Sequence, residues 1–400
     1  MKKLLLFGAG KIGRSFIGQL FSRGGYEVIF IDISREVIDQ LNLRRSYDVI
    51  IKSDLGNEII HINNVSGLHF SQTEEIMGEI RSTTLIATSV GPANLPQVLD
   101  ILGRGLKKRF NMEKNSRVDI IIAENLRNAA DFFSDQLKRN LPVQVIRDRI
   151  GLIETSIGKM VPIMTNEEIQ QDILRVYAEP YNTLILDQQS FKNPLPAVDG
   201  LAPKLNMKAW VDRKSFIHNL GHAATAYYGY LKHPESPYLY QILADREVHE
   251  FARSVMREAA AVLISLYPSE FSLSTLNDHI DDLLFRFQNK ALGDTVHRVG
   301  RDLNRKLGPE DRLAGAIRLA LKTGDPYQKI LYALTCGFYF RAPDQTGNLF
   351  PDDQEFVKNF MKNDFMNSLE KVCNFNRIEH DEVIRKAMDT NQEVISKFQI

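Results

Sequence analysis

Nine consecutive residues bring together side chains that can carry proton chemistry. They run from Lys214 to His222 with the sequence KSFIHNLGH. A lysine can take a proton from a hydroxyl group, and asparagine and histidine can hold the oxygen on which charge develops, without a metal ion. This segment is therefore the first candidate for a catalytic site.

The spacing of the segment suits one face of a helix. On an α-helix that turns about 100° per residue, Lys214, Asn219 and His222 fall within an arc of about 140°, so all three can address one pocket. His218 lies in the same arc, so periodicity does not choose between the two histidines. The alternative, which spacing alone favours, is that Lys214 extends into solvent while Asn219 and His222 form structural hydrogen bonds.

A glycine-rich motif near the start of the chain predicts a nucleotide-binding loop. It follows a strand-like apolar run and opens a helical pattern, which is the context that such a loop requires. Its residues are Gly8, Ala9, Gly10, Lys11, Ile12 and Gly13. Gly8 would allow the tight turn, Gly10 the approach of a diphosphate, and Gly13 the close packing of helix on strand. The free N–H groups of the helix would hold the diphosphate.

An acidic residue ends the next strand-like run. Asp32 follows Val28-Ile29-Phe30-Ile31 at about the 20-residue spacing expected of the acid that binds the adenosine ribose. A carboxylate there repels a 2′-phosphate, which predicts NAD rather than NADP. FAD uses the same motif, but we identify no segment suited to its ring system. The remaining alternative is a glycine-rich turn in which Asp32 or Ser34 only caps the next helix.

Periodicity divides the chain into an α/β part and a helical part. Candidate strands at residues 3–7, 27–32, 84–87 and 119–123 alternate with candidate helices at 12–23, 35–43, 95–108 and 127–139. Further strands are expected at 47–51, 58–62, 68–70, 144–150, 152–157, 173–177 and 183–186. From residue 205 the pattern is helical, with prolines as breaks. This predicts an α/β N-terminal Rossmann-type domain with an extended sheet, followed by an all-α C-terminal domain.

A proline-rich stretch from residue 193 to residue 203 suits a domain connection. We therefore expect an NAD-binding Rossmann-type domain over residues 1–195. A helical substrate and catalytic domain is expected over residues 196–400.

Composition and charge exclude several classes of protein. Apolar and charged fractions are those of globular chains, not of collagen-like or disordered ones. Lys plus Arg and Asp plus Glu are equal at 50 each, so no global charge would attract nucleic acid or an anionic membrane. The two cysteines, Cys336 and Cys373, lack zinc-site spacing and are expected as buried free thiols. These features predict a cytoplasmic protein without a nucleic-acid or membrane partner.

Several motifs together resemble those of the polyol-specific long-chain dehydrogenases, the mannitol dehydrogenase family. The glycine-rich run continues into Arg14-Ser15-Phe16-Ile17-Gly18, and Lys214, Asn219 and His222 fit the pattern Lys-x4-Asn-x2-His. Other matching segments are Thr88-Ser89-Val90-Gly91-Pro92, Glu124-Asn125-Leu126, Arg298-Val299-Gly300-Arg301, Arg305-Lys306-Leu307 and Asp311-Arg312-Leu313. The resemblance covers nearly the whole chain.

The resemblance implies metal-independent chemistry with Lys214 as the acid–base group. It also implies that Asn219 and His222 hold the substrate oxygen, which favours His222 over His218. Carried over by position, Asn125, Arg298 and Lys306 would contact the substrate. From composition alone, the arginines and lysine between residues 298 and 306 could equally form a solvated basic face.

The length of the chain is close to that of the compact branch of the family that acts on sugar phosphates. This implies reversible oxidation of D-mannitol 1-phosphate by NAD to D-fructose 6-phosphate, in a monomer or homodimer. Two departures bear on the substrate. Gly158-Lys159 replaces a family Asp-Arg whose acid is expected to touch substrate hydroxyls, and Asp302-Leu303 replaces a family Gln-Pro or Asp-Pro near the expected phosphate site.

Three alternatives stay open. The same chemistry could act on a free polyol or on a hexuronate such as tagaturonate or fructuronate. A two-domain β-hydroxyacid dehydrogenase also joins a Rossmann domain to helices, but its Lys-x-x-Asn spacing does not fit Lys214 and Asn219. A chain that binds NAD as a sensor, without catalysis, is the third.

Overall fold

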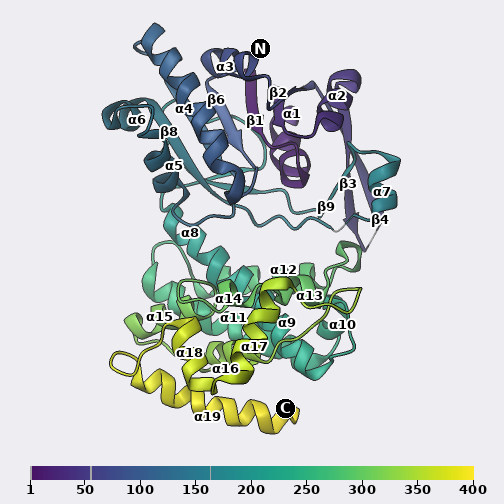
Figure 1. The fold of residues 1–400 in the computed structure, drawn as a ribbon, viewed down its shortest axis with the longest axis vertical. Coiled ribbons are helices and arrows are strands. Elements are labelled where there is room, and N and C mark those ends of the chain that lie inside the picture. Colours follow the sequence, from purple (N-terminus) through teal and green to yellow (C-terminus); the bar gives the residue numbers. More distant parts are fainter. Residues whose placement is uncertain (1, 55, 163) are drawn as a thin grey trace. The chain divides into compact units, whose positions relative to one another are not determined.

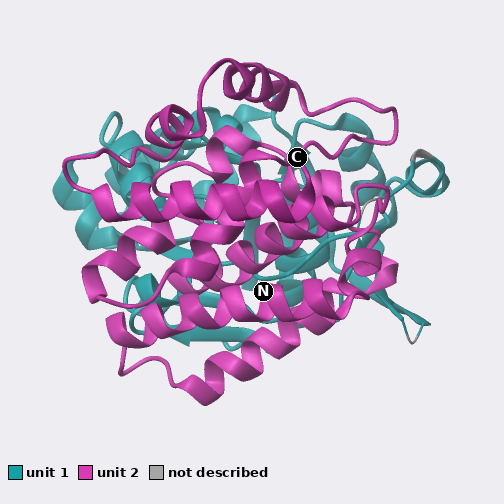
Figure 2. Ribbon diagram, turned by 90° about the horizontal axis from the view of Figure 1, so that it is seen from below, with its two compact units in different colours: residues 1–211 teal, residues 212–400 magenta. Residues whose placement is uncertain are grey.

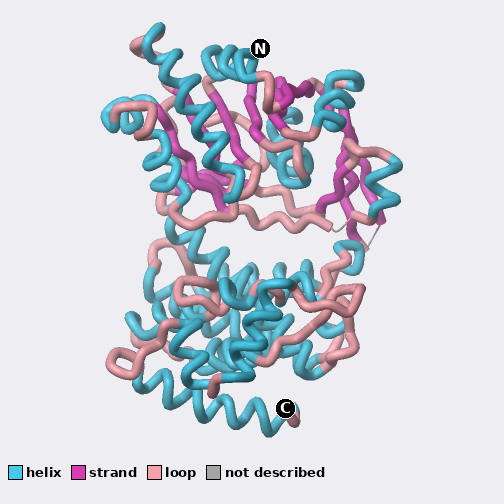
Figure 3. Tube along the Cα trace, viewed as in Figure 1, coloured by secondary structure: helices cyan, strands magenta, loops and turns pink. Residues whose placement is uncertain are grey.

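The computed structural model describes residues 2–54, 56–162 and 164–400. The chain forms two compact units, Met1–Val211 and Asp212–Ile400 (Figure 2). Figure 3 shows that the strands belong to the first unit and that the second is built from helices. The expected succession of an α/β domain and an all-α domain is therefore confirmed.

The first unit contains two β-sheets within the described residues. Its strands are β1 (Lys2–Phe7), β2 (Tyr26–Asp32), β3 (Ser46–Ser53), β4 (Gly56–Asn63), β5 (Val65–His69), β6 (Leu85–Thr88), β7 (Val118–Ile122), β8 (Ile150–Ser156), β9 (Val176–Ala178), β10 (Leu184–Asp187) and β11 (Leu201–Lys204). The larger sheet has the order β11-β10-β8-β7-β6-β1-β2-β5 and is parallel except where β10 meets β8. The smaller sheet has the order β4-β3-β9.

Helices connect these strands (Figure 1). They are the π-helix η1 (Gly13–Gly18), α1 (Gln19–Arg23), α2 (Arg35–Arg44), α3 (Thr73–Ser82), the 3₁₀ turn η2 (Pro92–Asn94), α4 (Leu95–Met112), α5 (Ala129–Leu137), α6 (Val143–Arg149), α7 (Asn166–Gln171) and α8 (Met207–Arg213), which crosses the boundary between the units. Alternate residues of β1 enter opposite cores. Leu4 and Leu6 pack with η1, α1 and α2, whereas Leu5 and Phe7 pack with α3 to α6. Because both faces are covered, the central strands read as continuous apolar runs.

The order of the strands in the larger sheet reverses between β1 and β6. From β1 it moves to β2 and β5, then returns to β6, β7 and β8 on the other side. In open parallel sheets, ligands bind outside the carboxyl ends of the strands at such a switch point. The switch therefore marks the edge where a dinucleotide is expected.

One expected strand is wrong. Residues 144–150 were expected as a strand, but 143–149 form α6, which starts after Pro142. Three successive charged residues, 147–149, would place charge on both faces of a strand, whereas the helix buries only Ile146. The charged run decides against the strand because a strand exposes alternate residues to opposite faces.

The proline-rich stretch is partly a strand. β11 pairs with β10 in parallel and extends the larger sheet, although it contains Pro203. Proline is tolerated there because β11 is an edge strand. The predicted boundary after residue 195 falls before this strand, whereas the two compact units divide after Val211.

The described residues of the second unit form helices joined by loops, with no strand apart from an isolated bridge between Tyr238 and Thr295. Its helices are the π-helix η3 (Lys214–Asn219), α9 (Leu220–Lys232), α10 (Leu239–Leu243), α11 (Arg246–Leu266), α12 (Leu273–Phe287), the 3₁₀ turn η4 (Lys290–Leu292), α13 (Val296–Gly300), α14 (Leu303–Lys306), α15 (Ala314–Thr323), α16 (Gln328–Phe338), α17 (Pro351–Lys362), α18 (Phe365–Cys373) and α19 (Asp381–Phe398). Helices α9, α11 and α16 pack on one another and form its centre.

Both cysteines are free and buried, as expected. Cys336 lies on α16 and Cys373 ends α18. In the part of the chain that the structure describes, none of the helices combines the length and the apolar character needed to cross a lipid bilayer.

Candidate active site

The glycine-rich loop makes a tight turn at the carboxyl end of β1. Gly8 has φ +103°, and a Cβ atom there would stand 2.3 Å from the carbonyl oxygen of Ser89. A Cβ atom on Gly13 would stand 2.0 Å from the carbonyl oxygen of Gly8, so the helix touches the turn itself. Gly10 faces open space. Only glycine fits at positions 8 and 13, and the backbone at Gly10 is accessible to a ligand.

The other residues of the loop divide between core and surface. Ala9 is buried, Ile12 packs on the core from the side of the loop, and Lys11 is exposed. The helix continues as a π-helix through Gly18 instead of the regular α-helix expected. Single π-helical turns inside α-helices are frequent at functional sites.

Asp32 is tied to this loop. One carboxylate oxygen, Oδ2, accepts a hydrogen bond of 2.7 Å from the amide of Ala9. The other, Oδ1, accepts one of 2.9 Å from the amide of Ser34. Each carboxylate oxygen can accept more than one hydrogen bond, so Asp32 can also receive ribose hydroxyls. Ser34 caps α2 by its own hydroxyl, so the cap does not depend on Asp32 alone.

A cavity of about 210 Å³ opens beside Asp32. Its lining comes from the ends of four neighbouring strands, β5, β2, β1 and β6, and from η2 and α4: Phe7, Gly8, Gly10, Ile31, Asp32, Ile33, Phe70, Ser89, Val90, Asn94, Gln97 and Val98. Ile33 is 74% exposed, although it directly follows a buried strand. An apolar slot with a carboxylate at its side fits the adenosine half of a dinucleotide.

We expect Asp32→Ala to weaken NADH binding roughly 10-fold or more, because the ribose hydroxyls lose a charged acceptor. The preference for NADH over NADPH should fall by more than this, because the repulsion of the 2′-phosphate is also lost. Fluorescence titration with both dinucleotides measures the two effects. Glu36→Ala, which removes an exposed acid from the first turn of α2, is the matched control. An unchanged preference would mean that another residue recognises the ribose.

Arg14 of η1, which belongs to the matching motif but has no role predicted from the sequence, contacts the glycine-rich loop. It is 7% exposed, and its Nε donates to the carbonyl of Ala9 at 2.7 Å. Its NH1 donates to the carbonyl of Ile173, also at 2.7 Å. Burial lowers its pKa, and Asp32 is among the groups that oppose this shift. The guanidinium therefore holds the glycine-rich loop from inside the first unit.

Lys214 begins a π-helix in the second unit. In this segment hydrogen bonds connect residues five apart, so Lys214 and Asn219 lie closer to one face than the expected α-helix would place them. Burial, followed by the positive charge of Arg312, lowers the pKa of Lys214 to about 8. A lysine with this pKa is partly deprotonated near neutral pH and can act as a general base.

Arg312 also connects with the end of this π-helix. Its NH1 donates to the backbone carbonyl of Asn219 at 3.4 Å, and its Nε donates to Asp311 at 2.7 Å. It is 9% exposed. The guanidinium is thus fixed beside the candidate catalytic segment. The Asp311-Arg312 pair belongs to a matching segment, but no role for it follows from the sequence alone.

His222 lies in a pocket of aromatic and charged groups. Its ring stacks on Phe287 of α12, with the centroids 4.4 Å apart and the planes at 10°. Its Nε2 is 3.4 Å from Oδ2 of Asp294. Burial, and then the charge of Arg298, hold the pKa of His222 well below its ordinary value. The imidazole is therefore neutral at pH 7.

His218 lies in the same pocket and meets Phe287 edge-on, with the centroids 5.6 Å apart. Burial also lowers its pKa well below the ordinary value. Its ring centroid is 6.1 Å from that of His222. The structure therefore leaves both histidines beside Phe287, and the choice of His222 stays a prediction.

The predicted basic residues lie near His222. Arg298 on α13 forms an ion pair with the buried Asp294, which itself faces His222. Lys306 ends α14 and donates through Nζ to the carbonyl of Val299 at 2.8 Å. Lys306 is 7% exposed, and burial lowers its pKa well below the ordinary value. The second unit thus gathers Arg298 and Lys306 around His222, whereas a solvated basic face would leave them exposed.

Asn125 belongs to the first unit. It follows β7 and is exposed. Within the first unit, the loop, Asp32 and Asn125 lie at or just after strand ends, and within the second unit the proton-transfer and basic residues surround η3 and α9. The three predicted substrate contacts are therefore divided, with Asn125 in the first unit and Arg298 and Lys306 in the second.

The two departures from the family pattern both have structural roles. Lys159 is 6% exposed, and its Nζ donates to the carbonyl of Tyr181 at 2.8 Å and to Asn182 Oδ1 at 2.9 Å. Asp302 takes the left-handed conformation with φ +74° ahead of α14. Its amide donates to the buried Asp353 at 3.0 Å. An aspartate tolerates this conformation, whereas a proline at the next position would remove the amide that Leu303 donates to Asp353.

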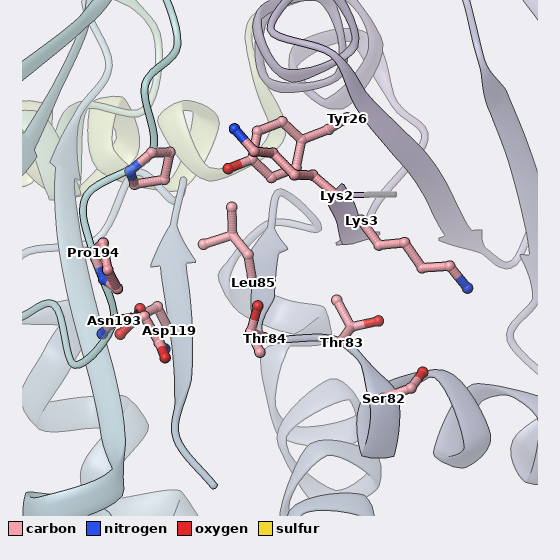
Figure 4. Close-up of a pocket in the computed structure, with 11 residues that line it drawn as sticks. Lys2, Lys3, Tyr26, Ser82, Thr83, Thr84, Leu85, Asp119, Asn193 and Pro194 are labelled. Atoms are coloured by element: carbon pink, nitrogen blue, oxygen red, sulfur yellow. Dashed lines mark hydrogen bonds between the residues drawn. The ribbon is translucent and has the colours of Figure 1, made fainter.

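A larger cavity, of about 480 Å³, lies at the opposite edge of the same sheet (Figure 4). Lys2, Tyr26 and Leu85 stand at the starts of β1, β2 and β6, and Asn193 and Pro194 close one side. It is therefore separate from the dinucleotide edge, where these strands end. Across residues 2–54, 56–162 and 164–400, no group of three or more His, Cys, Asp or Glu side chains is placed to hold a metal ion.

A doubly wound sheet with a dinucleotide loop, joined to a helical unit with a half-buried lysine, defines a two-domain dehydrogenase. Residues 2–200 match the model of the mannitol dehydrogenase Rossmann domain, and residues 206–399 match that of the mannitol dehydrogenase C-terminal domain. The chain therefore belongs to the mannitol dehydrogenase family. It is an NAD-dependent polyol dehydrogenase that acts on a CH–OH group, as the sequence predicted.

Two curated relatives illustrate the similarity. The chain is 30% identical over 374 residues to a mannitol-1-phosphate 5-dehydrogenase of Buchnera aphidicola, covering 93% of this chain and 94% of the relative. It is 33% identical over 346 residues to the mannitol-1-phosphate 5-dehydrogenase of Halalkalibacterium halodurans, covering 86% and 89%.

Two solved structures share the fold. One is D-sorbitol dehydrogenase in substrate-free form, with a TM-score of 0.80 and 15% identity, covering 99% of this chain and 93% of that one. The other is mannitol 2-dehydrogenase of Pseudomonas fluorescens with NAD and D-mannitol, with a TM-score of 0.76 and 14% identity, covering 100% and 94%.

Proposed function

We propose that this protein catalyses the reversible oxidation of D-mannitol 1-phosphate by NAD to D-fructose 6-phosphate. The observation that carries this choice of substrate is the basic cluster around His222, in which Lys306 and Arg312 are buried and Arg298 is half-buried. A free polyol has no charge to match such a cluster, whereas a phosphate group does. The names and lengths of the curated relatives point to the same substrate.

In the proposed reaction Lys214 is the general acid–base group. In the oxidation direction its neutral amine takes the proton of the substrate hydroxyl, and in the reduction direction its ammonium returns this proton to the oxygen. Bound NAD, held by the glycine-rich loop and Asp32, would supply the acceptor for the hydride that leaves the carbon carrying this hydroxyl. The pKa of about 8 allows Lys214 to serve both directions near neutral pH.

Asn219 and His222 hold the substrate oxygen while its charge changes. The neutral His222 can donate or accept one hydrogen bond without adding a charge that would compete with Lys214. Its stacking on Phe287 fixes the plane of the ring. This arrangement requires no metal ion, so we expect turnover to survive a chelator.

Phosphate recognition is assigned to Lys306 and Arg298, with Asn125 as a further substrate contact. Burial, and then the neighbouring cations, lower the pKa of Lys306, which disfavours its charged ammonium form. The negative charge of a bound phosphate dianion would favour the ammonium form again. Arg298 would exchange its pairing with Asp294 for the phosphate or share it.

The first experiment follows NADH oxidation by absorbance with fructose 6-phosphate, fructose, tagaturonate and fructuronate, each with and without EDTA. We expect turnover of fructose 6-phosphate alone, unchanged by EDTA. Turnover only of a ketose or uronate without phosphate would move the protein to another branch of the family while keeping the Lys214 mechanism. Binding of NADH without turnover of any of the four would favour an NAD sensor.

A free polyol or a hexuronate is the second candidate substrate, favoured by one observation. Gly158 stands where the family carries this acid, and the neighbouring Lys159 is held inside the first unit by Tyr181 and Asn182. The hydroxyl contacts expected of the missing acid are therefore not replaced by this side chain. The panel of four substrates distinguishes this candidate from the first.

A further inference from the structure

Glu124 occupies a buried position at the switch point of the larger sheet. It follows β7, whose neighbour β6 ends at Thr88, and the amide of Ala123 donates to the carbonyl of Thr88 at 3.0 Å. Glu124 is 6% exposed. A buried carboxylate is costly unless its charge is compensated, so its partners show what it does.

Those partners are two consecutive backbone amides. Oε1 accepts a hydrogen bond of 2.9 Å from Val90, and Oε2 accepts one of 2.9 Å from Gly91. Burial raises the pKa of Glu124, and these two amides, with the Thr88 hydroxyl, act in the opposite direction. The ionised carboxylate therefore binds the loop that follows β6 as a clamp with two points of attachment.

The clamped loop forms one wall of the nucleotide cavity. Ser89 donates its amide to the carbonyl of Phe7 at 2.8 Å, and its own carbonyl oxygen packs against Gly8. Ser89 and Val90 line the 210 Å³ cavity opposite Asp32. Asn94 closes the loop by donating from Nδ2 to the carbonyl of Val90 at 2.8 Å. The distance between the two walls of the cavity thus depends on where Glu124 holds Val90 and Gly91.

We propose that Glu124 is a positioning residue for the dinucleotide, which holds the loop after β6 against the glycine-rich loop so that the cavity is formed before NAD arrives. It does not itself line the cavity beside Asp32. Its effect is on the binding of the cofactor, and it does not depend on which polyol is the substrate. A preformed cavity binds more tightly because no ordering of the loop is required on binding.

The test compares Glu124→Gln with Glu154→Gln. A glutamine at position 124 can accept from only one of the two amides and points its own NH₂ group at the other. Glu154 on the adjacent β8 is a matched control, because its Oε1 also accepts a backbone amide, that of Ala130, at 2.9 Å. It lies one strand further from the cavity and does not line it.

We expect the dissociation constant of NADH, measured by fluorescence titration without substrate, to rise roughly 10-fold or more in Glu124→Gln. The Michaelis constant for NADH should rise in parallel, with kcat at saturating NADH changed much less. Glu154→Gln should bind NADH as the wild type does. Its melting temperature should change by about as much as that of Glu124→Gln. Glu124→Asp, which keeps the charge but shortens the reach, should restore part of the affinity.

Two results would overturn the proposal. One is wild-type NADH affinity in Glu124→Gln. The other is an equal loss of affinity in both glutamine variants, which would indicate a general weakening of the sheet. If Glu124→Gln does not fold, the comparison of Glu124→Asp with Glu154→Asp replaces it, and equal NADH affinity in these two variants would also overturn the proposal.

Discussion

Replacing Lys214 with alanine is expected to lower kcat by about 10²- to 10⁴-fold, the usual loss when a general acid–base group is removed. The affinity for NADH should change little, because the dinucleotide loop belongs to the first unit. Steady-state rates in both directions measure the loss. Lys208→Ala, which removes an exposed lysine from α8, is the control. Turnover of Lys214→Ala within a few-fold of the wild type would remove Lys214 from the mechanism.

The pH dependence of this reaction follows from the lowered pKa of Lys214. The amine is the active form for oxidation, so the oxidation rate should rise with pH through about 8 and then level off. The reduction rate, which needs the ammonium, should fall over the same interval. Both dependences should vanish in the residual activity of Lys214→Ala. A profile unchanged by the substitution would assign the titration to another group.

Protein stability gives an independent readout for the same variant. A lysine whose pKa is lower in the folded protein than in the unfolded chain destabilises folding while the unfolded chain is protonated. This cost is full below about pH 8 and disappears as the pH rises through the ordinary lysine pKa of about 10.4. Lys214→Ala should therefore melt no lower than the wild type at pH 7, so a loss of activity would not reflect unfolding. A lower melting temperature at pH 7 would show that Lys214 has a stabilising partner.

Replacing Lys306 with alanine is expected to raise the Michaelis constant for fructose 6-phosphate roughly 10- to 100-fold, the effect of one charged hydrogen bond. Any slow turnover of unphosphorylated fructose should be unaffected, and this difference separates phosphate recognition from a structural role. Because burial lowers the pKa of Lys306, its charge is present only at pH values below that pKa, and affinity for the phosphate should weaken as the pH rises.

Arg301→Ala is the matched control for Lys306→Ala. Arg301 belongs to the same basic run, but it is exposed and its guanidinium lies over the ring of Phe350 at 5.1 Å. It should leave the Michaelis constant for fructose 6-phosphate unchanged. If Arg301→Ala and Lys306→Ala have equal effects, the basic run acts as a diffuse surface charge, and the assignment of a specific phosphate contact is wrong.

Predictions from local sequence were accurate where the physical reason was local. Gly8 has the positive φ of a tight turn, and Asp32 stands at the end of β2 because the lengths of β1, the helix and β2 set its place. The buried central strands were visible as apolar runs. The strand expected at 144–150 is wrong because three successive charged residues, 147–149, would place charge on both faces of a strand, whereas the helix buries only Ile146.

The candidate site in the second unit was only partly visible. Spacing and resemblance identify Lys214, Asn219 and His222. The helical spacing of these residues predicts an α-helix, however, and not the π-helix that brings Lys214 and Asn219 closer to one face. Phe287 and Asp294, which surround His222, come from segments more than sixty residues away in the chain. Their roles follow from packing alone.

The sequence by itself determined the order of the two domains, the dinucleotide loop with its acidic partner and the candidate acid–base lysine. These features depend on side-chain periodicity and on short spacings, which a chain carries before it folds. Only the tertiary structure decided which charges surround those residues. The pKa of Lys214 depends on burial beside Arg312, and the shape of the nucleotide cavity depends on how Glu124 holds a neighbouring strand end. Desolvation and contacts between distant segments exist only in the folded chain, so no spacing within the sequence could reveal them.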